Sequence, residues 1–116
     1  MTVLSQSDPT AEIACTLPPT EAGGRLGALG ALVGDRLEGV TRAGDRLRVR
    51  INRGDDIDLE SRASAWATEE KDCCAFLGFA IESEPDAVTL EIVAPDGAGA
   101  MLDGIEWIVR AAGRPA

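Results

Sequence analysis

Alternating side chains make Arg46–Asn52 the stretch that most limits how this chain can fold. Leu47, Val49 and Ile51 alternate there with three arginines. Successive side chains of a β-strand point to opposite faces of a sheet, so this order predicts a strand with one apolar and one charged face. A sheet that contains such a strand buries one face in a core and leaves the other in water.

Strand and helix signals alternate along the chain of 116 residues. Runs with a period of two predict strands, and apolar residues that recur every three or four positions predict helices. A turn is expected at residues 43–45, and Gly78 is expected to end the second helix. The predicted strands cover residues 12–17, 37–42, 46–52, 79–84 and 87–93, and the predicted helices cover residues 20–36, 56–77 and 97–112.

The order of these predicted elements is βαββαββα. It favours an α+β sandwich with a ferredoxin-like core, in which helices cover one face of a mainly antiparallel sheet. Residues 1–10 are polar and are expected to form a flexible N-terminal tail. Residues 11–116 are expected to form a single α+β domain, since their number suits one hydrophobic core.

Acidic residues outnumber basic residues by 20 to 11, which gives a formal net charge of −9. This charge repels phosphate groups and argues against nucleic acid or an anionic membrane surface as a partner. No apolar run approaches the ~20 residues of a membrane span, and the first ten residues lack the features of a signal peptide. The sequence therefore predicts a cytoplasmic protein with reduced cysteines, and its preference for Arg over Lys indicates a bacterial source.

The chain has no histidine and no tyrosine. Catalysis by Ser-His-Asp or Cys-His groups is therefore excluded, as are zinc and iron sites with histidine ligands. Any reaction chemistry has to come from Cys, Asp, Glu, Arg, Ser or the single lysine, Lys71. The three cysteines are an odd number, which argues against a disulfide framework.

Cys73 and Cys74 are adjacent and follow an acid-rich run on the predicted long helix. Thiolates are good ligands for soft metal ions. Adjacent Cα atoms are ~3.8 Å apart, below the usual span of a disulfide, so the pair is not expected to form one. If Cys15 converges with the pair, the three sulfur atoms would make a trigonal site for Hg(II) or As(III). The alternative for Cys73, on the apolar stripe of its helix, is a small buried hydrophobe.

Glu70 precedes the cysteine pair by one helical turn and shares the apolar stripe with Trp66. Burying a carboxylate is expensive, so either the stripe reaches the surface at this point or Glu70 is held there for a purpose. A carboxyl group beside a thiol can carry a proton, which makes Glu70 and Asp72 the candidate catalytic acids. Asp72 and Glu69 are alternatively expected on a solvated face. Lys71 is expected to pair with Glu69 or Glu70 or to face water.

Three segments of the chain together form a recognisable pattern. They are Cys15-Thr16-Leu17, Arg46-Leu47-Arg48, and Glu70-Lys71-Asp72-Cys73-Cys74-Ala75-Phe76-Leu77 followed by Phe79. This arrangement resembles a group of small, largely uncharacterised bacterial proteins that carry the vicinal-cysteine motif E-x-[DE]-C-C-x-F-L-x-F. The resemblance implies a functional thiol pair. It also implies an association with resistance to heavy metals, including mercury and arsenic.

The leading hypothesis is a cytoplasmic protein that binds a soft metal or metalloid ion through Cys73 and Cys74, with Cys15 as a further ligand. The first alternative is an organomercurial-type lyase, in which the thiols hold the metal and Glu70 or Asp72 supplies a proton. Thiol redox chemistry and a structural domain with incidental cysteines are two further alternatives. The sequence predicts no cofactor besides such an ion. It leaves open whether the protein is an enzyme and whether it is a monomer or a homodimer.

Overall fold

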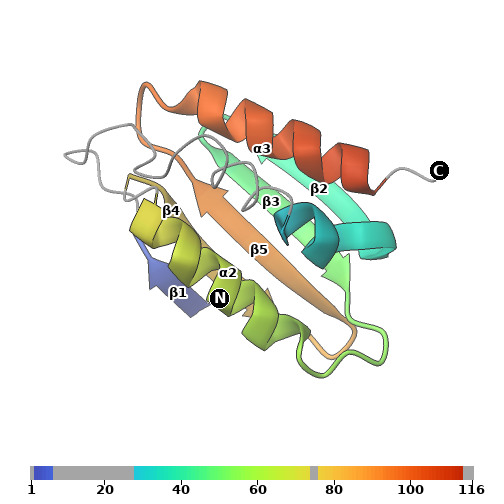
Figure 1. Ribbon diagram of the computed structural model, residues 1–116. Helices are drawn as coiled ribbons and strands as arrows, with labels where there is room; N and C mark the ends of the chain where they lie inside the picture. The colour runs from blue at the N-terminus through green and yellow to red at the C-terminus, as the bar shows by residue number, and fades with distance from the viewer. Residues whose placement is uncertain (1, 7–27, 74–75, 114–116) are drawn as a thin grey trace.

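The computed structural model describes residues 2–6, 28–73 and 76–113, which contain one five-stranded antiparallel sheet (Figure 1). The strands are β1 (Thr2–Ser5), β2 (Leu37–Ala43), β3 (Arg46–Asn52), β4 (Gly78–Ser83) and β5 (Ala87–Val93). Their order across the sheet is β1-β4-β5-β3-β2.

Helices cover one face of this sheet (Figure 1). They are α2 (Leu59–Cys73), α3 (Gly99–Ala112) and helical residues 28–33, which lead into the short 3-10 helix η1 (Gly34–Arg36). The prediction of an α+β sandwich with helices on one face of an antiparallel sheet is confirmed.

β5 lies at the centre of the sheet and pairs on both sides. It pairs with β3 from Arg46↔Val93 to Asn52↔Ala87, and with β4 from Gly78↔Val93 to Ser83↔Val88. The β2–β3 hairpin turns at Gly44, whose φ of +60° is a conformation that glycine adopts without steric strain. Predicted strands 46–52 and 87–93 have the observed bounds, and the predicted strand 37–42 is one residue short of β2.

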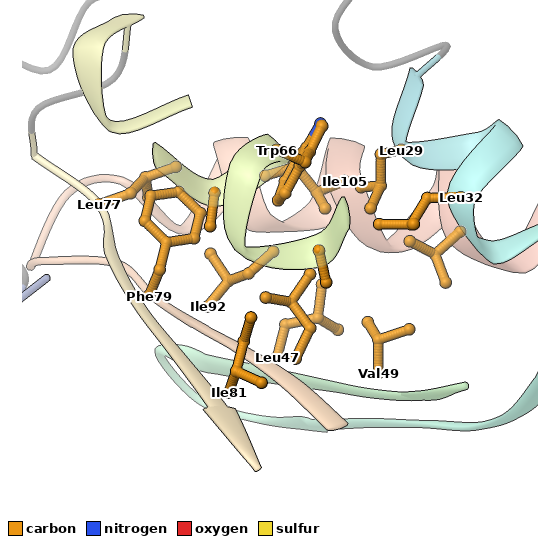
Figure 2. Packing of buried hydrophobic residues seen from close by; sticks show 14 of the residues in the cluster. Leu29, Leu32, Leu47, Val49, Trp66, Leu77, Phe79, Ile81, Ile92 and Ile105 are labelled. Atoms are coloured by element: carbon orange, nitrogen blue, oxygen red, sulfur yellow. The ribbon is translucent and has the colours of Figure 1, made fainter. Parts of the chain in front are cut away.

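The core lies between the sheet and the helices, and Figure 2 shows its side chains converging from both layers. Leu47 and Val49 point into it from β3, as their alternation with arginine predicts. Trp66 of α2 meets Phe79 of β4 edge to face, with ring centroids 5.9 Å apart and an interplanar angle of 88°. Such aromatic pairs contribute about 0.5–1.5 kcal/mol beyond the area that they bury.

The second helix is shorter than predicted at both ends. α2 begins at Leu59 rather than at residue 56, because Asp56 instead accepts a hydrogen bond from the Asp58 amide and ion-pairs with Arg36 and Arg62. It ends at Cys73 rather than at residue 77. Residue 77 is fully buried between helix and strand, and Gly78 is the first residue of β4 rather than the end of a helix.

The expectation of a flexible tail over residues 1–10 is wrong for residues 2–5. These residues form β1, which pairs with β4 through Thr2↔Ile81 and Val3↔Ala80. Local sequence did not reveal this strand because its pairing partner lies more than 70 residues away. The predicted strand over residues 12–17 and the first part of the predicted helix over 20–36 lie outside the described residues.

Candidate functional site

The candidate site lies where α2 ends and the chain returns to the sheet. α2 is described as far as Cys73 and β4 begins at Gly78, so the chain turns from the helix layer to the sheet within a few residues. Phe76 and Leu77 are fully buried in the core. Their burial anchors the strand side of this turn, so the position of the helix end is set relative to β4.

Glu70 lies on the inner face of α2 and is only 5% exposed. Ala63, Trp66 and Ala67, one and two turns earlier, are buried on the same helix. The apolar stripe of α2 therefore does not reach the surface at Glu70 but stays buried through this residue. A carboxyl group thus stands inside the protein one helical turn before position 73, whereas Glu69 is exposed, as predicted.

Lys71 joins three parts of the chain beside this turn. Its Nζ donates hydrogen bonds to the carbonyl oxygens of Leu77 and Gln6, each at 2.8 Å. An ammonium group has three donors and forms strong hydrogen bonds to acceptors in partly buried places. The sequence predicted a pair with an acid or exposure to water and missed these carbonyl contacts, because they depend on where β1 ends.

The thiols themselves lie largely outside the described part of the chain. The backbone of Cys73 is described as the last residue of α2, while the side chains of Asp72 and Cys73 and the whole of Cys15 and Cys74 are not. Among the described residues, no group of three or more Cys, Asp or Glu side chains is arranged to hold a metal ion. The convergence of Cys15 with the pair therefore stays a prediction.

The face of the sheet opposite the helices carries a second cluster of charged groups. The three outward arginines of β3 meet carboxylates from the neighbouring strands, as their alternation with apolar residues allows. Glu91 of β5 is buried between Arg46 at 3.0 Å and Arg48 at 3.8 Å. Arg50 contacts Glu84 at 2.6 Å and Glu38 at 2.9 Å, and these hydrogen bonds raise the pKa of Arg50 above its ordinary value. Because each arginine already has carboxylate partners, this cluster stabilises the sheet face.

Comparison with known proteins gives no further indication of function. No family model, no curated protein and no solved structure matches this chain. Within the described ranges, no helix is both long and apolar enough to cross a bilayer.

Proposed function

We propose that this protein binds a soft metal or metalloid ion, Hg(II) or As(III), through Cys73 and Cys74, with Cys15 as a third ligand. The observation that carries the proposal is the position of Cys73 at the end of α2, one turn after the buried Glu70. Adjacent side chains diverge by ~100° inside a continuous helix. Convergence of the two thiols on one ion therefore requires that the helical geometry does not continue through both cysteines.

The electrostatics of the helix end favour a metal over a free thiolate. The carbonyl end of a helix carries partial negative charge, which disfavours a further negative charge such as a free thiolate close to it. A soft cation replaces the thiol proton and supplies the positive charge itself. The net charge of −9 attracts cations toward the protein and adds to this preference.

Isothermal titration calorimetry of the reduced protein with Hg(II) and As(III) tests the proposal. Two thiols that hold one ion should bind it at least ~100-fold more tightly than one thiol. We therefore expect Cys73→Ser and Cys74→Ser each to lose that factor, while the exposed Glu69→Gln control binds as the parent does. The proposal fails if the parent binds no more tightly than glutathione, or if both serine variants bind as the parent does. Cys15→Ser separates three-coordinate from two-coordinate binding of As(III).

The buried Glu70 favours a second candidate, cleavage of a carbon–mercury bond. In this reaction the two thiolates hold an organomercurial cation, and the electron pair of the carbon–mercury bond takes a proton from Glu70 or Asp72. The products are a hydrocarbon and Hg(II) bound to the thiolates, and solvent then returns the proton to the carboxylate. A carboxyl group shielded from water on the core side of α2 suits the role of proton donor.

Gas chromatography of the hydrocarbon released from an alkylmercury salt distinguishes the two candidates. With excess glutathione present to take up the bound Hg(II), the lyase predicts repeated turnover that falls at least ~100-fold in Glu70→Gln or Asp72→Asn, within the usual range for loss of a general acid. Glu69→Gln is the matched control, since this neighbouring acid is exposed. Tight binding of Hg(II) without hydrocarbon release would support binding alone.

A further inference from the structure

The outer face of α3 carries a large apolar residue that is not buried within a single chain. α3 buries Leu102, Ile105 and Val109 against the sheet. On its opposite face Trp107 is 69% exposed. Tryptophan is usually well buried in folded proteins, and exposed tryptophans are enriched at protein interfaces. This face of α3 therefore has the character of a contact surface.

Residues around Trp107 extend this surface along the whole helix. Ala100, Gly104, Trp107 and Ala111 are all exposed and follow one another at intervals of four, three and four residues. That spacing is the a/d repeat by which two helices pack side by side. A Cβ atom added at Gly104 would meet nothing within 4 Å, so the stripe is open at this position, one turn before Trp107. The stripe thus combines one large side chain, Trp107, with small residues against which a large side chain of another helix can pack.

We propose that α3 is the interface of a homodimer, in which it packs antiparallel against α3 of a second copy. A two-fold axis between residues 105 and 106 sets Trp107 of each copy against Gly104 of the other. The same axis sets Ala100 against Ala111. Two-fold interfaces require a surface that is complementary to itself, and this pairing of large with small positions meets that requirement. A parallel pair would instead set Trp107 against Trp107.

Charges beside the stripe support the same arrangement. Asp103 and Arg110 lie one heptad apart on one flank of the stripe, and their side chains are 72% and 46% exposed. In the antiparallel pair these flanks face each other, so Asp103 of one copy meets Arg110 of the other at two symmetric places. Within one copy Asp103 contacts Arg42 and Arg110 contacts Glu106, and both side chains keep exposed atoms for a second partner. The complementary charges select a second copy of this chain as the occupant.

Sedimentation velocity of the full chain over a range of concentrations tests the proposal. We expect a reversible monomer–dimer equilibrium in the parent protein. Gly104→Gln fills the space that receives Trp107 while improving helix propensity, so it should weaken the dimer at least ~30-fold and raise the unfolding temperature of the monomer. Trp107→Arg should weaken the dimer by a similar factor. Ile57→Arg is the matched control, because this residue is 84% exposed but lies outside α3.

Each outcome decides the proposal. A parent protein that sediments as a monomer at every concentration overturns it, and so does a dimer that Gly104→Gln and Trp107→Arg leave intact. A dimer that Ile57→Arg abolishes while the α3 variants do not would locate the interface near residue 57 and also overturn the proposal. Cysteine variants should leave the equilibrium unchanged, so this result is independent of the proposed thiol function.

Discussion

At the scale of single residues, Lys71 links the candidate site to two other parts of the chain. It is the only lysine of the chain, and its Nζ bonds the carbonyl oxygens of Gln6 and Leu77. One of these carbonyls follows β1 and the other precedes β4. The residue between Glu70 and the cysteine motif therefore holds the end of the first strand against the turn that follows α2.

Lys71→Met keeps the length of the side chain and removes its three donors. Hydrogen bonds from charged groups contribute about 1.5–3 kcal/mol, so β1 should open more readily in this variant. We expect hydrogen exchange of the amides in residues 2–5 to accelerate at least ~10-fold, which corresponds to about 1.4 kcal/mol. Lys71→Arg retains a cationic donor and should restore most of the protection. Equal exchange in the Met variant and the parent would show that the two contacts do not hold β1.

At the scale of elements, Gly104 within α3 and Gly113 at its C-cap have opposite surroundings. Gly113, its C-cap, donates its N–H to the Val109 carbonyl oxygen and lies against Leu37 of β2. A Cβ atom at this position would approach the Leu37 Cβ to 2.9 Å, a contact that neither side chain can relieve by rotating. Gly104 has open space instead. The close approach of the end of α3 to β2 thus explains why position 113 is a glycine, but it does not explain the glycine at position 104.

Alanine at each position should change stability in opposite directions. Gly113→Ala introduces overpacking and should lower the free energy of unfolding by about 1–3 kcal/mol. Gly104→Ala should raise it by up to ~1 kcal/mol, since alanine is the better helix former. Urea denaturation at low protein concentration measures both, and Gly104→Ala serves as the control for substitution in α3. A stable Gly113→Ala variant would mean that α3 and β2 can move apart without penalty.

Across the whole molecule, segments distant in sequence contact both edge regions of the sheet. β1 covers the edge of β4, and the buried residues Ala80 and Ile81 face it in the ladder. Arg110 of α3 reaches the Val40 carbonyl oxygen of β2, the opposite edge strand. Uncovered sheet edges invite pairing with other chains, and β1 takes the edge position that β4 would otherwise hold.

Removal of residues 1–5 should turn β4 into an edge strand. We expect the free energy of unfolding to fall by about 1–3 kcal/mol and light scattering to increase on storage. Val3→Thr in the full chain is the control, because Val3 is 59% exposed and threonine is well tolerated in strands. A truncated chain that matches the parent in urea denaturation and scattering would show that β1 contributes nothing to the sheet.

Patterns repeated within a few residues were sufficient to predict much of this protein from its sequence. The alternation in 46–52 and 87–93 predicted β3 and β5 with their bounds, and the three- and four-residue spacing predicted the buried faces of α2 and α3. The adjacent cysteines and Glu70 were likewise identified by local sequence. These predictions hold because side-chain direction along a strand or helix depends only on local backbone geometry.

Tertiary structure alone decided the strand order, the presence of β1, the end of α2 at Cys73 and the partners of Lys71. Each depends on a contact between residues far apart in sequence, as when β3 and β5 pair across more than 30 residues. The helix end is an example: the pattern in α2 continued to Leu77, but burial of that side chain beside β4 ended the helix earlier. Local propensity gives way at such points because packing of distant segments contributes more free energy than a further helical turn.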